Sequence, residues 1–311
     1  MGKRPLVSVL MPVTRDGEVF EQAIESIRQQ TVDDWEVVCV QNREGLDLDR
    51  VIGGDPRIRH SVQPIPSEVL TRIHALGAAT GEFVAFLDDD DRWMPTKLER
   101  QLDQLRADPE LCGCHTDYEV INEHGEVVAH LKNGPVTYDR LLTFSSGEFI
   151  PSFMFRTEYL RSIGGFDPTF PICADTDMLF RACFAGRVGY LPEVLVQYRW
   201  HPVQMTTKYV DSQLSTLRII EDHRRLAAMQ GDWHRWRISW LGTAKVRTNA
   251  AQTAYRKAAA ARAQDGPSGR HLMTSLRFNP VVAPWTASQE ATRRLRTWAG
   301  RPQSGRDIDG S

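Results

Sequence analysis

The stretch Gly81-Glu82-Phe83-Val84-Ala85-Phe86-Leu87-Asp88-Asp89-Asp90-Asp91-Arg92-Trp93-Met94-Pro95 decides the fold. The segment Phe83–Leu87 is continuously apolar and too short for a helix, so it predicts a buried parallel strand. Four consecutive carboxylates follow it directly. Because ligands bind beyond the carboxyl ends of the strands in an open α/β sheet, these aspartates are expected at a ligand site.

Carboxylates so close together repel one another, and a divalent cation with oxygen ligands is the common remedy. A cation at this position implies a bound anionic ligand. The alternative is structural, because acidic loops are commonly solvated and Asp91 is placed to start a helix after Pro95, where proline suits the first turn. The rest of the chain decides between the two interpretations.

Strands and helices alternate through the first hundred residues. The other expected strands are Leu6–Val13, Trp35–Val40 and Arg57–Val62. One helix has apolar positions at Phe20, Ala23, Ile24 and Ile27, and another covers Ser67–Thr80. This alternation predicts an α/β fold with a mostly parallel, doubly wound sheet. The loops after three of the strands, at 14–17, 41–47 and 88–91, would then line one crevice.

The pattern changes after residue 106. A hairpin is expected from Leu111–Ile121 and Glu126–Leu131, and further strands from Phe149–Phe155 and Val188–Trp200. Asp175-Thr176-Asp177 opens a helix that runs to Gly186. Carboxylates at a helix start are favoured by the helix dipole alone, so capping is the alternative role for one of these aspartates.

The chain is expected to be helical from Tyr209 to about Gln264, with Trp233, Trp236 and Trp240 on one side. Such a stripe indicates packing against the body or a second subunit, and so a homodimer contact through the C-terminal helices. Residues 241–311 hold 12 Lys and Arg against 4 Asp and Glu. We interpret this excess as a solvated basic helix and a flexible tail; contact with nucleic acid or anionic lipid is the alternative.

Composition sets broad limits. With 311 residues and 41% hydrophobic content, the chain can bury a sizeable core, and a net charge of −2 does not predict nucleic acid as a partner. The five cysteines are odd in number and form no CxxC pair, which favours reduced thiols in the cytoplasm. No segment approaches the roughly 18 apolar residues of a membrane span, so membrane contact is expected to be peripheral at most. GxGxxG and Walker sequences are absent, so metal and side chains would have to hold any phosphate.

Several ordered motifs resemble one family. They are 7–13 (VSVLMPV), 23–27 (AIESI), 30–31 (QT), 86–93 (FLDDDDRW), 164–167 (GGFD), 174–181 (ADTDMLFR) and 198–201 (YRWH). Together they are similar to the large GT-A family of inverting, nucleotide-sugar-dependent glycosyltransferases, the family 2-like enzymes. The resemblance covers roughly residues 5 to 207 and implies a GT-A fold and sugar transfer to a hydroxyl or amine.

The resemblance also implies roles for individual residues. Asp175 would be the general base that accepts the acceptor's proton. Asp90 and His201 would bind Mn²⁺ or Mg²⁺, which stabilises the leaving diphosphate. The residues implied in binding the nucleotide sugar are Pro12, Val13, Thr14, Gln41, Asn42, Arg72, Asp88 and Asp89. The residues implied in binding the acceptor or in supporting roles are Asp91, Trp93, Asp167 and Asp177.

Two departures from the family pattern affect these roles. Ala174 stands where glutamate is commonest in the family. Because its methyl group cannot accept a hydrogen bond, Asp177 or the acceptor would have to take over the role of that glutamate. Gln41-Asn42 replaces two aspartates, one of which contacts the nucleobase. An amide donates and accepts hydrogen bonds, so it can still pair with uracil or thymine. We therefore expect a UDP- or dTDP-sugar first and a GDP-sugar next, with a small molecule or glycan as acceptor.

The resemblance divides the chain into a glycosyltransferase domain (1–207), a helical extension (208–264) and a basic tail (265–311). Within the domain, residues 1–106 would bind the nucleotide sugar and 107–207 the acceptor. A sugar-1-phosphate nucleotidyltransferase is the competing enzyme, but 14–17 (TRDG) is unlike its glycine-rich basic loop. A non-catalytic nucleotide-sugar-binding protein is the other alternative, suggested by Ala174 and Gln41-Asn42.

Overall fold

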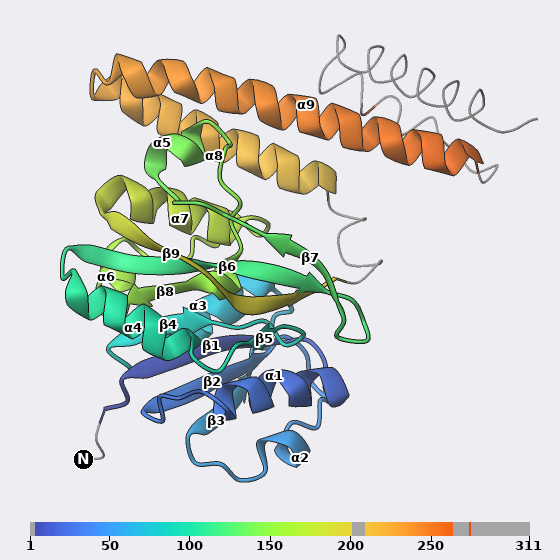
Figure 1. Ribbon diagram of the computed structural model, residues 1–311. Coiled ribbons are helices and arrows are strands. Elements are labelled where there is room, and N and C mark those ends of the chain that lie inside the picture. Colours follow the sequence, from blue (N-terminus) through green and yellow to red (C-terminus); the bar gives the residue numbers. More distant parts are fainter. Residues whose placement is uncertain (1–3, 201–208, 264–273, 275–311) are drawn as a thin grey trace, which may run out of the picture. The chain divides into compact units, whose positions relative to one another are not determined.

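The computed structural model describes residues 4–200, 209–263 and 274 (Figure 1). The chain forms two compact units, Met1–Gly242 and Thr243–Ser311, and the sheet belongs to the first. Both predicted halves of the domain, 1–106 and 107–207, contribute strands to this one sheet. The functional division between the halves stays a prediction. His201 and the tail from 265 onward lie outside the described residues, apart from residue 274.

Nine strands of the described chain form one sheet in the order β3-β2-β1-β4-β8-β6-β9-β5, with β7 paired to β6 (Figure 1). The strands are β1 (Val7–Val13), β2 (Trp35–Gln41), β3 (Ile58–Val62), β4 (Phe83–Phe86), β5 (Arg92–Trp93), β6 (Leu111–Ile121), β7 (Val127–Leu131), β8 (Phe153–Arg156) and β9 (Arg187–Arg199). The strands β3, β2, β1 and β4 are mutually parallel, whereas β8 runs antiparallel to both β4 and β6. The predicted α/β fold and the hairpin of β6 and β7 are confirmed.

Helices cover both faces of the parallel strands. Those in the first unit are α1 (Glu18–Arg28), α2 (Asp49–Ile52), α3 (Glu68–Ala78), α4 (Lys97–Ala107), α5 (Tyr138–Leu142), α6 (Thr157–Ser162), α7 (Ala174–Ala185) and α8 (Tyr209–Met229). Alternate β1 residues, Val7 to Val13, share one buried cluster with the apolar sides of α1 and α4. Because strand side chains alternate, the intervening residues face α3, which packs against β1 and β2.

Two local differences from the sequence expectations have simple causes. The strand expected over Phe149–Phe155 begins with a 3₁₀ turn, η1 (Ile150–Ser152), because Pro151 has no N–H to donate to a sheet. The helix after the aspartates begins at Lys97, and β5 lies before it. Asp91 therefore does not cap that helix, which removes the structural explanation considered for it.

The C-terminal helical region is interrupted once. α8 ends at Met229, and α9 (Trp233–Ala263) begins after a turn in which Gly231 has a φ of 72°. Glycine adopts this left-handed conformation without the steric cost that a Cβ atom brings. None of the described helices combines the length and the apolar composition needed to cross a membrane.

Candidate functional site

The carboxyl ends of β1, β2 and β4 meet at one edge of the sheet. Val13 pairs with Gln41 across β1 and β2, and the N–H of Asn42 donates to the carbonyl of Val13 at 3.1 Å. The N–H of Leu87 donates to the carbonyl of Leu10 at 3.2 Å, which sets the aspartates directly beside the β1 end. The three predicted loops therefore start side by side. The nucleotide-binding candidates Pro12, Val13, Thr14, Gln41, Asn42, Asp88 and Asp89 all belong to this edge.

Asp89 holds the loop after β1. Its Oδ2 accepts hydrogen bonds from the Thr14 N–H, the Thr14 hydroxyl (2.8 Å) and the Arg15 N–H (3.1 Å). Arg15 Nε also lies 3.2 Å from Asp89 Oδ1. Burial raises the pKa of Asp89 to about 6, although Thr14 and Arg15 oppose the shift. Asp89 therefore fixes the backbone of the first loop, so its contribution to ligand binding would be to position Thr14.

Asp90 and Asp91 are almost completely buried. Arg15 Nη2 lies 3.2 Å from Asp90 Oδ2. Asp91 Oδ1 accepts the Arg199 N–H at 2.9 Å, whereas its buried Oδ2 has no hydrogen-bond partner in the described chain. Burial and the neighbouring Asp88 and Asp90 raise the pKa of Asp91 well above its ordinary value. This end of β4 thus holds more negative charge than the surrounding residues neutralise.

Arg199 is a central residue to which sequence reasoning gave no role. It is 1% exposed at the end of β9, and its guanidinium donates to the Asp90 carbonyl at 3.0 Å and to Gln22 Oε1 at 2.7 Å. It also donates to the carbonyls of Asn122 and Glu123 in the β6–β7 turn. One side chain thereby joins the acidic loop to α1, β9 and the hairpin. The available signal was an arginine two residues before His201 in the YRWH motif.

Arg72 joins the acidic strand end to α7. Its Nη2 donates to Asp88 Oδ1 at 2.9 Å, and its buried Nη1 has no hydrogen-bond partner among the described residues. Burial disfavours the charged guanidinium, but the charges of Asp88 and Asp175 outweigh this and raise the pKa of Arg72. The structure therefore brings Arg72, Asp88 and Asp175 into one electrostatic group, and Arg72 keeps a free N–H donor within it.

Asp175 lies in the first turn of α7 and is partly exposed, so an acceptor can reach it. Its Oδ1 accepts the Thr176 N–H at 2.8 Å. Cys173, which precedes the helix, has a φ of 66°, a conformation that is uncommon for residues with a side chain and often marks functional segments. The Ala174 methyl group is buried and supplies no polar contact.

Asp177 is committed to a structural pair. Its Oδ2 accepts from Arg181 Nη2 at 2.6 Å and Nε at 3.0 Å, and its side chain is 8% exposed. Arg181 also donates to the carbonyls of Ile163 and Gly165. This pair holds the glycine turn after α6 and leaves Asp177 little freedom to accept a proton from a substrate.

Glu148 is a second carboxylate near Asp175 that the sequence did not single out. Burial and the charge of Asp175 raise the pKa of Glu148 to about 8, although the Thr176 and Ser146 side chains oppose the shift. The residue lies in the loop between α5 and η1, where no periodicity or motif marks it. Its nearness to Asp175 exists only in the folded chain.

Trp93 and Asp167 have structural contacts. The Trp93 indole N–H donates to the Pro151 carbonyl at 3.3 Å, and the ring is buried under the Lys97 ammonium. Asp167 Oδ1 accepts the Thr169 N–H at 2.8 Å, which lowers the pKa of Asp167. The acceptor or supporting roles implied for these two residues stay predictions.

The donor set at the strand end suits a hard divalent cation. Carboxylate oxygens are the ligands that Mg²⁺ and Mn²⁺ prefer, and the unpartnered buried Oδ2 of Asp91 shows that the negative charge here is incompletely compensated. Within residues 4–200, 209–263 and 274, however, no three His, Cys, Asp or Glu side chains are grouped as a metal site. The predicted ligand His201 lies outside those residues.

Comparisons with known proteins agree with this fold. The family model described as "Glycosyl transferase family 2" matches residues 8–164. A chondroitin synthase of Pasteurella multocida (strain Pm70) is 25% identical over 215 residues, covering 67% of this chain and 22% of the synthase. The Escherichia coli UDP-Glc:alpha-D-GlcNAc-diphosphoundecaprenol beta-1,3-glucosyltransferase WfgD is 31% identical over 140 residues, covering 44% of this chain and 55% of WfgD. The chain thus spans about a fifth to about a half of these relatives.

Solved structures give the same fold. S. aureus TarS 1–349 in complex with UDP-GlcNAc superimposes with a TM-score of 0.57 at 17% identity, covering 70% of this chain and 66% of TarS 1–349. A second TarS 1–349 structure, in complex with UDP, gives a TM-score of 0.54 at 17% identity and covers 69% of this chain and 65% of TarS 1–349. At this identity the likeness establishes the GT-A fold alone.

Proposed function

The chain belongs to glycosyltransferase family 2, and from that premise we propose that it transfers a sugar, with inversion, from a nucleoside-diphosphate sugar to a hydroxyl or amine. The observation that carries this proposal is the position of Arg72. It pairs with Asp88 at the strand end and interacts with Asp175 on α7. A donor bound at the strand end and an acceptor bound at α7 would therefore meet beside this arginine.

The chain's own residues can perform the transfer as follows. The acceptor oxygen or nitrogen forms a bond to the anomeric carbon from the face opposite the leaving group, which inverts that carbon. The bond to the diphosphate oxygen breaks, and its electron pair leaves with the nucleoside diphosphate. Asp175 accepts the acceptor's proton as general base. The unpartnered Arg72 Nη1 would donate to the diphosphate, where negative charge develops.

A divalent cation, Mn²⁺ or Mg²⁺, fits the same account. Asp90 would hold it, with Asp88 adjacent, Asp91 as a supporting carboxylate and His201 as the further ligand that the resemblance implies. Bound there, the cation would supply Lewis-acid stabilisation to the leaving diphosphate. Asp89 would contribute by fixing the Thr14–Arg15 backbone against which the nucleotide lies.

We propose UDP- or dTDP-sugars as first donors, with GDP-sugars next. The TarS complexes with UDP and UDP-GlcNAc and the UDP-Glc donor in the name of WfgD support this order. Gln41 is buried and Asn42 partly exposed, so Asn42 is the better placed of the two to reach a nucleobase. The acceptor would be a small molecule or a glycan.

Nucleoside-diphosphate release tests this function. The full chain would be incubated with UDP-GlcNAc, UDP-Glc, dTDP-Glc or GDP-Man, in Mn²⁺, Mg²⁺ or EDTA. We expect slow metal-dependent hydrolysis of at least one donor, because water can replace the acceptor. Binding without any turnover, even with glycan acceptors present, would instead indicate a non-catalytic nucleotide-sugar-binding protein. Pyrophosphate-dependent cleavage would indicate a nucleotidyltransferase.

A further inference from the structure

The first turns of α9 expose large parts of two tryptophan side chains and one leucine side chain, although the Arg224 guanidinium lies 3.8 Å from the centroid of the Trp240 ring. Trp233 is 65% exposed, Trp240 48% and Leu241 58%. Residues spaced by seven and eight positions lie on the same side of a helix, and the exposed Arg237 lies between them on that side. We call these four residues the tryptophan face.

The opposite side of α9 is fixed to the first unit. Arg235 Nε donates to Asp139 Oδ1 at 3.0 Å, and its guanidinium lies over the Tyr138 ring, 4.9 Å from the centroid. Ser239 is fully buried on this side. Trp233, Trp236 and Trp240 contact one another edge to face, with centroids 6.1 Å apart in each successive pair. The helix is therefore anchored in a way that keeps the tryptophan face turned outward.

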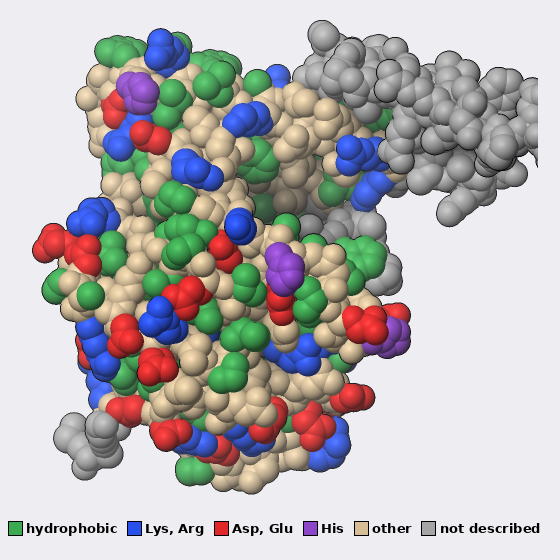
Figure 2. Space-filling view, in the orientation of Figure 1, with side chains coloured by type: hydrophobic (Ala, Val, Ile, Leu, Met, Phe, Trp, Pro, Cys, Tyr) green, Lys and Arg blue, Asp and Glu red, His purple; other side chains and the backbone are tan. Residues whose placement is uncertain are grey.

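The sequence of α9 carries basic charge only. Residues 233–263 contain seven Lys and Arg and no Asp or Glu. The three carboxylates that most closely precede α9 in the chain are paired: Glu221 in α8 with Arg225 at 2.7 Å, Asp222 in α8 with Arg218 at 3.8 Å, and Asp232 in the following turn with Arg235 at 3.5 Å. Arg237 has no ion-pair partner within the described chain. In Figure 2, the region where α8 meets α9 shows hydrophobic and Lys or Arg side chains together with Asp or Glu and His side chains.

These observations favour an anionic membrane over a second copy of the chain. A two-fold symmetric dimer would set the tryptophan face against itself, so Arg237 and its basic neighbours would meet like charges. Anionic headgroups attract the same arginines and lysines, and tryptophan rings settle at the boundary between headgroups and acyl chains. The absence of a spanning helix in the described chain agrees with binding in the interface plane.

We propose that the tryptophan face of α9 binds the surface of an anionic lipid bilayer, with Trp233, Trp240 and Leu241 entering the interface and Arg237 contacting headgroup phosphates. This docking is independent of the sugar-transfer chemistry. It would hold the enzyme at the membrane without a spanning segment.

Vesicle flotation of the full chain tests the proposal. We expect the protein to float with vesicles of phosphatidylcholine and phosphatidylglycerol at 7:3 and to stay behind with phosphatidylcholine alone. Trp233→Ser combined with Trp240→Ser should reduce the bound fraction at least tenfold. Arg237→Glu should weaken binding by about tenfold at low salt and by less at high salt, since the headgroup attraction is screened.

Matched controls distinguish the face from general surface effects. Arg106→Glu changes the same charge on exposed α4, and Val128→Ser removes an apolar side chain from β7 that is 58% exposed. Both should float like the wild type. Trp233→Ser alone tests the face if the double variant fails to fold, because this side chain is 65% exposed.

Two results would overturn the proposal. One is equal flotation of wild type and Trp233→Ser with anionic vesicles. The other is a vesicle-independent dimer in sedimentation velocity that Trp233→Ser dissociates, which would assign the face to a second copy.

Discussion

Carboxylates are buried at both edges of the parallel strands, but they differ in how completely hydrogen-bond donors and cations pair them. At the amino edge, Glu36 accepts from the Ser8 hydroxyl at 2.6 Å, the Thr80 N–H at 2.7 Å and the Thr80 hydroxyl at 2.8 Å. Arg59 Nη2 lies 2.6 Å from its other oxygen. Burial alone would raise the pKa of Glu36, but these donors together lower it.

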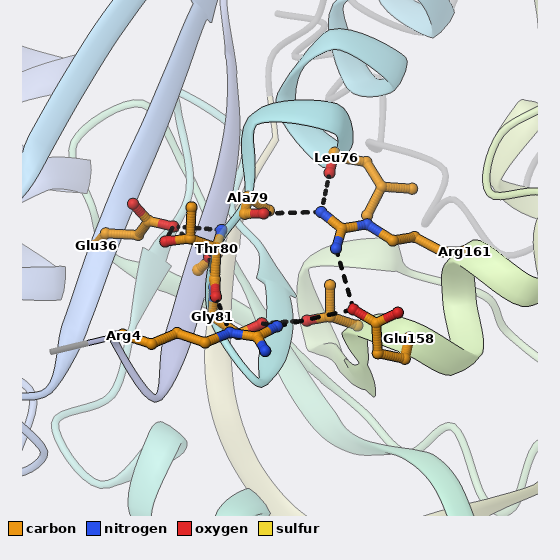
Figure 3. A network of polar contacts seen from close by, with 10 residues as sticks. Arg4, Glu36, Leu76, Ala79, Thr80, Gly81, Glu158 and Arg161 are labelled. Atoms are coloured by element: carbon orange, nitrogen blue, oxygen red, sulfur yellow. Dashed lines mark hydrogen bonds and ion pairs between the residues drawn. The ribbon is translucent and has the colours of Figure 1, made fainter. Parts of the chain in front are cut away.

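The surroundings of Glu36 are equally complete (Figure 3). Arg4 donates to the carbonyls of Thr80 and Gly81, and Arg161 donates to those of Leu76 and Ala79. A Cβ atom on Gly81 would lie 2.5 Å from the Ser8 nitrogen, so the turn into β4 has no room for a larger residue. Glu36 is therefore fully paired without a ligand, whereas the buried indole nitrogen of the neighbouring Trp35 has no hydrogen-bond partner in the described chain.

At the carboxyl edge, by contrast, buried charged groups lack partners. Asp91 Oδ2 and Arg72 Nη1 are buried without partners in the described chain, and burial raises the pKa values of Asp89 and Asp91. Buried polar groups are normally satisfied, and an unmatched buried carboxylate and guanidinium on neighbouring segments are groups that a bound ion or anionic ligand would pair. The comparison teaches that one sheet can pair a buried carboxylate fully at one edge and leave buried carboxylates incompletely compensated at the other, where we propose that the ligand binds.

The largest effect should come from Asp175→Asn. An amide cannot accept the acceptor's proton, so turnover should fall by about 10²- to 10⁴-fold while nucleotide affinity stays unchanged. Steady-state release of the nucleoside diphosphate and nucleotide titration measure the two quantities. Asp177→Asn is the matched control: it should weaken the Arg181 pair and lower stability with far less effect on turnover. The reverse outcome would move the general base to Asp177.

At the amino edge, Glu36→Gln should destabilise the fold by about 2 kcal/mol, because hydrogen bonds to a charged group are lost. Urea unfolding at pH 7 measures this. Since the pKa of Glu36 is lowered in the folded state, its contribution is present above its ordinary value of 4.5 and is lost as the pH falls through the lower folded value. The difference in unfolding free energy between the wild type and Glu36→Gln should therefore shrink below about pH 4.5. An advantage that persists at pH 3 would contradict this role.

Replacing a carboxylate by an amide at the carboxyl edge should raise the free energy of unfolding, whereas Glu36→Gln lowers it. Asp91→Asn keeps an acceptor for the Arg199 N–H and removes one of four adjacent carboxylates, so the ligand-free protein should gain about 0.5–1 kcal/mol in unfolding free energy. Thermal unfolding in EDTA measures it beside Glu36→Gln. A loss of stability comparable to that of Glu36→Gln would mean that both edges are structural.

The smallest expected effect concerns the nucleobase. If the ends of β2 contact the base, Asn42→Asp should change the order of preference among UDP, dTDP and GDP, with each lost hydrogen bond costing about 0.5–1.5 kcal/mol. Gln41→Asp should change the preference among the diphosphates less, since the Gln41 side chain is buried. Competition binding with the three diphosphates tests this. An unchanged order in both variants would assign base recognition elsewhere, to Pro12–Thr14 or Arg72.

The sequence predicted the parts of the site that lie within single segments. The apolar run before Asp88 predicted β4, and the shared carboxyl edge of parallel strands predicted that the loops starting at Thr14, Gln41 and Asp88 lie together. It could not assign Arg199 or Glu148, because their importance comes from contacts between segments far apart in the chain. It favoured Asp175 over Asp177 as general base through the resemblance alone, since the Arg181 partner of Asp177 becomes visible only in the folded helix.

Nucleotide titration of Asp90→Ala tests the central claim, that the carboxyl edge is the ligand site, most directly. Wild type and Glu36→Gln should both bind UDP with Mn²⁺, and UDP at 100 times its dissociation constant should add about 2.7 kcal/mol to their stability. Asp90→Ala should lose the Mn²⁺-dependent binding while remaining folded. Wild-type affinity of Asp90→Ala for UDP in Mn²⁺, measured by isothermal titration, would contradict the account.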